Sequence, residues 1–133
     1  MTENALNEVV ESVIGMMNAL DLYATVTRGA LTIGNSISCE VAPSALSNNF
    51  LDKESIVPLG LVLNAKHHNL ETATKAMNLI HASLTRMTEY TSGTGWEIVD
   101  IRNSTLPQVI GREDNNDWLL ASRLTVLYYW KGE

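Results

Sequence analysis

The three histidines are the first residues whose chemistry could define an active site. His67 and His68 are adjacent, and His81 follows thirteen residues after the second of them. Neighbouring side chains in a strand point to opposite faces, so His67 and His68 are not expected to share one metal ion. No His-Glu-x-x-His pattern accompanies them. The sequence therefore favours solvated or loop histidines over a metal site.

The candidate nucleophile is Cys39, the single cysteine of the chain. It stands among residues that alternate as in a strand, with no basic neighbour in sequence to lower its pKa, which favours an inert core thiol. There is no Gly-x-Ser-x-Gly sequence of a hydrolase. Gly93-Thr94-Gly95 precedes a predicted strand, whereas phosphate loops lie between a strand and a helix N-terminus, so we expect a turn there. These residues predict neither an enzyme nor a cofactor site.

Acidic residues gather at Glu113, Asp114 and Asp117, where they could bind a hard cation. Their spacing matches no calcium loop, which favours a solvated charged loop. The net charge is −6, and the nine basic residues are scattered singly. A protein that grips a nucleic-acid backbone needs clustered Lys and Arg. We therefore expect no specific nucleic-acid binding.

The bulk composition predicts one globular domain over residues 1–133. The apolar fraction is 45% and the charged fraction 18%. No stretch approaches the roughly 20 apolar residues of a membrane span, and the acidic start lacks the basic region of a secretory signal. A lone cysteine fits a reducing compartment. We expect synthesis in the cytosol and no membrane partner.

Two segments have the three- and four-residue spacing of an amphipathic helix. The first covers about residues 3–20, and the second starts near Asn69, a good N-cap. The apolar stripe of the first helix consists of Leu6, Val9, Val10, Val13, Ile14, Met17 and Leu20. The stripe of the second consists of Ala73, Ala76, Met77, Ile80, Leu84 and Met87.

The remaining segments are predicted to be strands and loops. Strand patterns cover 22–27, the alternating residues around Leu31 and Ile33, 37–41, 55–66, the segment beginning at Trp96, and 118–130. Pro58 and Gly60 favour an edge or irregular strand at 55–66. Loops are expected at 43–49 and, as a long polar acidic loop, at 103–117. The fold class that follows is α+β, with a mixed, mostly antiparallel sheet and two main helices packed on one face.

The last strand is apolar on both faces, a pattern typical of a strand covered on both sides. One face carries Trp118, Leu120, Leu124, Val126, Tyr128 and Trp130, and the other carries Leu119, Ala121, Thr125, Leu127 and Tyr129. Two helices cover a limited area of sheet, so a neighbouring subunit could supply the second cover.

The three tryptophans, Trp96, Trp118 and Trp130, all lie at predicted strand ends. Core packing is one interpretation, and a protein interface, where Trp and Tyr are enriched, is the other. Trp130, with Tyr128 and Tyr129 beside it, is the strongest interface candidate.

Three stretches resemble the small tail-terminator proteins of long-tailed bacteriophages, also called tail-completion or minor capsid proteins. They are the opening helix followed by residues 22–26, the segment 57–63 with residues 67–69 leading into the second helix, and the segments 95–101 and 106–114 followed by the closing strand. Together they cover most of the chain, and each is a degenerate pattern. The family has no catalytic residues to carry over.

The resemblance implies a ring, commonly a hexamer, on the head-proximal end of the tail tube. Such a ring ends tube polymerisation and presents a surface to the head connector. The implied partners are further copies of the chain, the major tail tube protein and the head–tail connector protein, while DNA could pass through the ring without specific binding. The implied location is the virion tail, after assembly in the host cytoplasm.

Six residues are the candidates for the contact between subunits: Arg112, Glu113 and Asp114 in the loop, and Tyr128, Tyr129 and Trp130 on the final strand. Two other functions stay open. One is a head–tail connector or head-closure protein, and the other is a small-molecule-binding module or enzyme that uses the cleft between helix and sheet.

Overall fold

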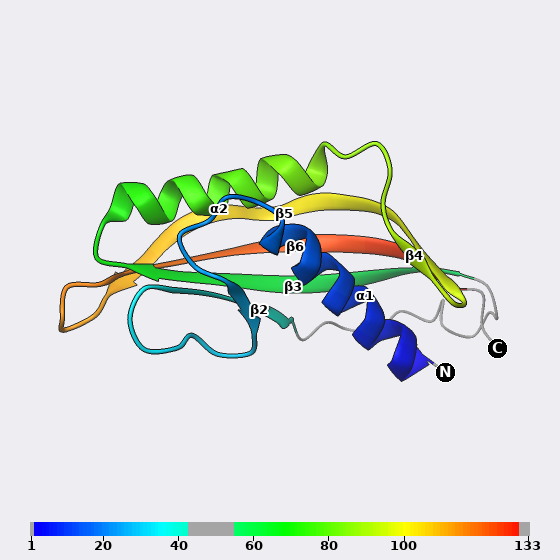
Figure 1. The fold of residues 1–133 in the computed structure, drawn as a ribbon, viewed down its shortest axis with the longest axis horizontal. Helices are drawn as coiled ribbons and strands as arrows, with labels where there is room; N and C mark the ends of the chain where they lie inside the picture. Colours follow the sequence, from blue (N-terminus) through cyan, green and yellow to red (C-terminus); the bar gives the residue numbers. More distant parts are fainter. Residues whose placement is uncertain (1, 43–54, 131–133) are drawn as a thin grey trace.

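The computed structural model describes residues 2–42 and 55–130, so the loop expected at 43–49 lies outside the described residues. Within these described ranges, two helices and six strands follow one another along the chain (Figure 1). In order they are α1 (Thr2–Asn18), β1 (Val26–Arg28), β2 (Ser36–Val41), β3 (Ser55–His67), α2 (Leu70–Thr85), β4 (Ser92–Gly93), β5 (Trp96–Arg112) and β6 (Trp118–Trp130).

The strands form one mixed sheet in the order β1-β2-β3-β6-β5-β4. Only β1 and β2 are parallel, and the other described pairs are antiparallel. The α+β class with a mixed, mostly antiparallel sheet is therefore confirmed. The sheet curls into a half-barrel rather than lying flat. Long strands twist strongly, and β3, β5 and β6 span 13, 17 and 13 residues.

Both helices form because each has an apolar stripe that the sheet buries. In α1 the stripe supplies Val9, Val10, Val13 and Met17, all fully buried. Helix α2 begins where Asn69 Oδ1 accepts a hydrogen bond from the Thr72 N–H at 3.0 Å, the N-cap expected from the sequence.

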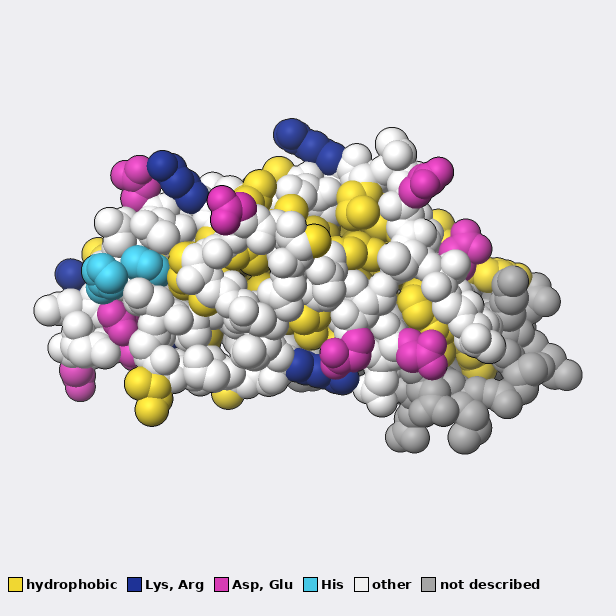
Figure 2. All heavy atoms as spheres, viewed as in Figure 1, with side chains coloured by type: hydrophobic (Ala, Val, Ile, Leu, Met, Phe, Trp, Pro, Cys, Tyr) yellow, Lys and Arg dark blue, Asp and Glu magenta, His cyan; other side chains and the backbone are white. Residues whose placement is uncertain are grey.

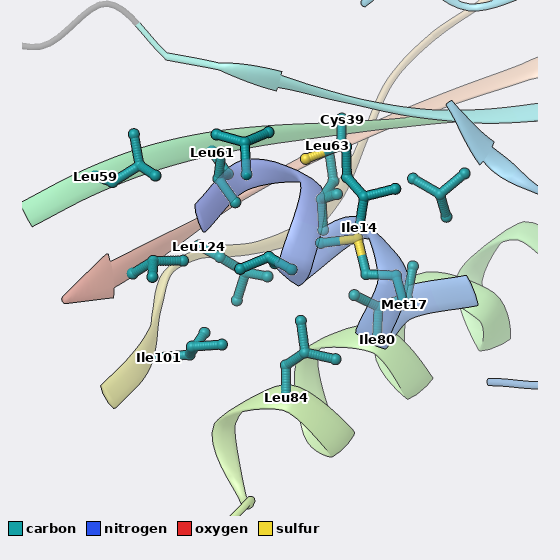
Figure 3. Close-up of a cluster of buried hydrophobic side chains, with 14 of the residues drawn as sticks. Ile14, Met17, Cys39, Leu59, Leu61, Leu63, Ile80, Leu84, Ile101 and Leu124 are labelled. Carbon is teal, nitrogen blue, oxygen red and sulfur yellow. The ribbon is translucent and has the colours of Figure 1, made fainter. Parts of the chain in front are cut away.

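The core lies between the helices and one face of the sheet (Figure 3). Alternate residues of β3, from Val57 to Ala65, point into it, and so do alternate residues of β6, from Leu120 to Tyr128. Figure 3 shows Leu61, Leu63 and Leu124 directed toward side chains of both helices. The final hairpin thus supplies much of the surface on which α1 and α2 pack.

Strand β3 is central, lying between β2 and β6, so the prediction of an edge strand is wrong. Pro58 lacks an N–H and is normally excluded from central strands. Strand β2 pairs only with Leu61–Lys66 of β3, and Pro58 lies beyond the end of that ladder. The proline therefore occupies a part of β3 that β6 pairs and β2 does not.

The prediction of a long polar loop at 103–117 is also wrong. Strand β5 continues to Arg112, and only Glu113–Asp117 connect it to β6. Residues 103–112 pair with β6 and contain three of the four register irregularities of β5. These bulges break the two-residue alternation, and the segment is largely exposed, so its residues carry no apolar pattern. Pairing with β6 keeps it extended.

The region between α1 and β2 has less strand than expected. Only Val26–Arg28 pair with β2, and residues 31–35 form no strand. Gly29 and Gly34 have φ values of +104° and +83°, which suit turns on either side of an exposed loop. Ile33 in that loop is 100% exposed.

Candidate functional site

A serine, a histidine and an asparagine meet between α2 and the β5–β6 hairpin, with the serine and histidine buried and the asparagine exposed. His81 Nε2 lies 2.7 Å from Ser122 Oγ, and His81 Nδ1 lies 2.7 Å from Asn103 Oδ1. Burial lowers the pKa of His81, against a smaller opposing effect of the Asn103 hydrogen bond. A neutral imidazole that donates from Nδ1 to Asn103 and accepts at Nε2 from the Ser122 hydroxyl satisfies both contacts.

This order of groups is that of a nucleophile, a base and an orienting residue in acyl-transfer enzymes. Ser122 is 2% exposed and His81 3% exposed, however. A substrate could reach the Ser122 hydroxyl only if α2 moved away from the sheet. The arrangement is therefore a polar clamp that fastens α2 to β5 and β6.

Sequence reasoning missed this clamp because its members are 22 and 41 residues apart. Two signals could have found it. His81 is a polar residue beside the buried stripe of α2, and Ser122 interrupts the apolar, inward-facing series of β6. Polar groups at buried positions normally have hydrogen-bond partners, so each implies the presence of another.

His67 and His68 do not point to opposite faces, since their rings stack with centroids 4.6 Å apart. The expectation was wrong because β3 ends at His67, and the alternation of side chains ends with it. The Asn69 N–H donates to His67 Nδ1 at 2.9 Å, and burial, with the neighbouring charge of His68, lowers the pKa of His67. Within the described ranges, no three His, Cys, Asp or Glu residues are grouped so that they could hold a metal ion.

Cys39 is a buried thiol, as the sequence predicted. Burial raises its pKa to about 12 and outweighs the lowering effect of Arg28. Arg28 lies opposite Cys39 in the β1–β2 pairing. The sequence did not indicate this basic neighbour, because the two residues are not close together along the chain. The thiol is protonated at neutral pH and unsuited to nucleophilic attack.

The acidic residues lie in the short β5–β6 connection. Glu113, Asp114 and Asn115 line an open depression there, and Lys66 Nζ lies 3.9 Å from Glu113 Oε1. The Glu113 N–H donates to the Asp117 carbonyl oxygen at 2.8 Å, which closes the turn. Glu113 and Asp114 are exposed, as the prediction of a solvated loop requires, but Asp117 is buried and its carboxylate accepts a hydrogen bond from Asn115 Nδ2 at 3.2 Å, so the prediction is wrong for Asp117.

The candidate interface residues fall into two groups at opposite ends of the hairpin. Arg112 stacks over the Trp118 ring at 4.4 Å, at the same end as Glu113 and Asp114. Twelve residue steps separate Trp118 from Trp130 along β6, roughly 40 Å at ~3.3 Å per residue. The structure does not bring the two groups together within one chain.

At the other end, Tyr128 is 3% exposed and belongs to the core, so its side chain is not presented to a neighbour. Tyr129 and Trp130 are half-buried. Trp96 is opposite Trp130 in the ladder and buried, and its Nε1–H donates to Glu8 Oε1 at 2.8 Å. Core packing is therefore the role of Trp96.

Neither of the two described helices is long and apolar enough to cross a membrane.

The fold is similar to that of a known chain, although the sequence matches no protein family and no curated protein. A chain of the solved structure "Virion of native gene transfer agent (GTA) particle" superposes with a TM-score of 0.55 at 13% sequence identity. The similarity covers 89% of this chain and 85% of that chain.

Proposed function

We propose that this chain is a structural protein of a phage-like virion, which caps the tail tube as a ring and forms the tail-side surface that joins the head. The single observation that carries the proposal is the shared fold with a chain of a gene transfer agent virion. That similarity covers nearly the whole of both chains, so it concerns the complete domain rather than a common motif. The sequence resemblance to tail terminators supports the finer assignment to the tail.

The distribution of candidate contact residues supports a ring. A closed ring requires head-to-tail contacts in which two different patches of each copy meet. The Arg112–Asp114 end and the Trp130 end of the hairpin are such a pair, because they lie roughly 40 Å apart on the same rigid element. In this proposal the partners are further copies of the chain, the major tail tube protein and the head–tail connector protein.

The charge pattern supports a ring through which DNA passes without being held. Figure 2 shows Asp and Glu side chains spread over one face, with Lys and Arg as isolated side chains. The chain carries a net charge of −6. Acidic residues facing a channel would repel the phosphate backbone. No catalytic step belongs to this function, and the buried Ser122 hydroxyl has a structural role in it.

Electron microscopy of particles made from a genome with this chain disrupted tests the proposal. We expect tail tubes of uncontrolled length that fail to join filled heads, and normal tails when the chain is restored. Tails of normal length, with heads that leak DNA, would support the head-closure alternative instead. Particles unaffected by the disruption would overturn a structural role in the virion.

A further inference from the structure

Helix α2 begins at a tight corner after β3, at the end of the sheet where the β5–β6 connection lies (Figure 1). A side chain of β3 holds this corner closed, because the Asn69 N–H donates to His67 Nδ1 at 2.9 Å. Asn69 is also the N-cap of α2, and its Oδ1 accepts from the Thr72 N–H at 3.0 Å. A side-chain acceptor bonded to the N–H two residues further on has the connectivity of an Asx turn. His67 thus fixes the residue from which α2 starts.

This bond requires one protonation state of His67. A backbone N–H can only donate, so Nδ1 must carry a lone pair and the proton of the neutral ring is on Nε2. Protonation would direct one donor at another, and the bond would be lost. His81 differs, because its ring nitrogens lie 2.7 Å from Asn103 Oδ1 and Ser122 Oγ, and both oxygens can accept from an imidazolium. Of the two buried histidines, His67 is the one with a bond that protonation must break.

Two rings pack against His67, which is 8% exposed. His68 stacks on it with the centroids 4.6 Å apart, and Tyr23 meets it nearly at a right angle, also at 4.6 Å. The Tyr23 hydroxyl donates to the carbonyl oxygens of Ser36 and Lys66, and burial raises the pKa of Tyr23 to about 12, so this phenol stays neutral. A proton on His67 would therefore lie in a largely buried position beside a second imidazole.

The neighbouring charges act on His67 in both directions. Burial lowers the pKa of His67, and the charge of His68 lowers it further. Asp117, in the β5–β6 connection, has the opposite and smaller effect on the same pKa. The Asp117 carboxylate also accepts from Asn115 Nδ2 at 3.2 Å. The net direction is a lowered pKa, so the neutral ring that the corner requires is the favoured form at neutral pH.

The other charged side chains around the corner have partners of their own. They form three contacts: Lys66 with Glu113 at 3.9 Å, Glu71 with Lys75 at 3.1 Å, and Arg112 over the Trp118 ring at 4.4 Å. The first two are ion pairs, so neither brings an uncompensated anion to the imidazole. Trp118 is the β6 neighbour of His67, so Arg112 adds a cation at the same end. Within the described part of the chain, Asp117 is therefore the anion on which a protonated His67 would depend.

We propose that His67 is a pH-sensitive latch on the first turn of α2. At neutral pH the neutral ring holds Asn69 and closes the corner between β3 and α2. In mildly acidic solution Nδ1 takes a proton, the bond to Asn69 breaks, and the start of α2 loosens while the sheet stays intact. The contacts of His81 further along α2 can persist, so the opening is local.

The direction of the pH dependence follows from linkage. The folded pKa of His67 is lowered, so the latch contributes fully above the unperturbed value of about 6.5 and is lost as the pH falls toward the folded pKa. The latch concerns the single chain and does not depend on the proposed ring.

NMR of the histidine ring nitrogens and hydrogen exchange in the wild-type chain test the latch together. At about pH 7.5 the His67 ring should carry its proton on Nε2 and a lone pair on Nδ1. As this ring titrates, exchange of the Asn69 amide, corrected for the intrinsic effect of pH, should become about five- to tenfold faster, as expected for the loss of one hydrogen bond. Amides in the middle of β3 and β6 should keep their protection. A proton on Nδ1 at neutral pH, or an Asn69 amide that does not respond, would overturn the proposal.

Two substitutions of His67 separate the hydrogen bond from its titration. In His67→Asn an Oδ1 atom can accept from the Asn69 N–H as in an ordinary Asx turn and does not titrate, so the amide should stay protected in mild acid. His67→Phe keeps a ring for the contacts with Tyr23 and His68 but has no acceptor, so the amide should exchange at the fast rate throughout. His68→Gln is the matched control, because it leaves His67 in place and should retain the response.

The possible failures are distinct. An acid response that persists in His67→Asn, or one that disappears in His68→Gln, would assign the dependence to another group and overturn the latch. Thermal melts at neutral pH show whether each variant is folded, and the wild-type titration decides the question if a variant is not. Tail assembly enters none of these measurements, so the latch and the proposed function can fail separately.

Discussion

The imidazole of His81 on α2 lies 2.7 Å from the hydroxyl oxygen of Ser122 on β6, and both side chains are buried. The same imidazole contacts Asn103 on β5, so one side chain joins the helix to both strands of the final hairpin. His81 and Ser122 are buried, whereas Asn103 is exposed. The position of α2 on the hairpin therefore depends on a polar cluster whose histidine and serine are buried.

Replacing His81 with Leu should destabilise the fold, because the buried Ser122 hydroxyl would lose its partner, whereas Asn103 is exposed. We expect a loss of about 1–3 kcal/mol in the free energy of unfolding for the hydroxyl left unsatisfied. Urea unfolding followed by circular dichroism gives this value. Adding Ser122→Ala to His81→Leu should recover part of the loss, because it removes the unsatisfied hydroxyl. A double variant less stable than His81→Leu alone would contradict the clamp.

The stability of the fold should fall on acidification. Burial lowers the pKa of His81 in the folded state, below the value of about 6.5 of an unperturbed histidine. The folded protein therefore binds this proton more weakly than the unfolded chain does. Its stabilising contribution is complete above the unfolded pKa and decreases as the pH falls from there toward the folded pKa.

Unfolding free energies measured between neutral and mildly acidic pH test this dependence. His67 has a pKa lowered in the same direction, so it contributes to the wild-type slope. His81→Gln should reduce the slope without abolishing it. An unchanged slope in that variant would assign the dependence to other groups.

Gly93→Ala should destabilise the β4–β5 turn. A Cβ atom at Gly93 would lie 2.6 Å from Trp96 Cζ2, so the indole ring would have to move from its buried position and from Glu8. We expect a cost of about 1–3 kcal/mol, as for other overpacked sites. Gly15→Ala is the matched control, because nothing lies within 4 Å of its added Cβ and the residue is exposed in α1. There alanine should stabilise the helix by about 0.5–1 kcal/mol. Thermal melts that rank the two variants in the opposite order would contradict the packing described.

Tyr128→Ala should act on folding rather than on assembly. Tyr128 is 3% exposed, and truncating a buried aromatic side chain costs about 3–5 kcal/mol. Leu106→Ala, at a residue 60% exposed, should leave the unfolding free energy within about 0.5 kcal/mol of wild type. Chemical denaturation of the two variants measures both values. If Tyr128→Ala were as stable as wild type, this side chain could not be a core residue.

Much of the fold could be read from local patterns. The stripes of the two helices, the N-cap at Asn69 and the alternation along β6 are set by neighbours within a few residues, and the structure confirms them. Predictions from local patterns were wrong where pairing with a distant strand determines the backbone conformation. Residues 103–112 are extended because β6 pairs with them, although bulges and exposure remove the alternation that marks a strand. Pro58 favoured an edge strand of the sheet, yet it lies in the central strand β3, in a part that extends beyond the end of β2.

The sequence by itself determined the α+β class, the scattering of the basic residues along the chain and the two apolar faces of the last strand, because these depend only on residue types and short-range spacing. Only the tertiary structure decided which residues are neighbours across the sheet. It joined His81 to Ser122, placed Tyr128 in the core and separated the two ends of the hairpin. The physical reason is that strand pairing and register bring together groups tens of residues apart, and no local pattern encodes that register.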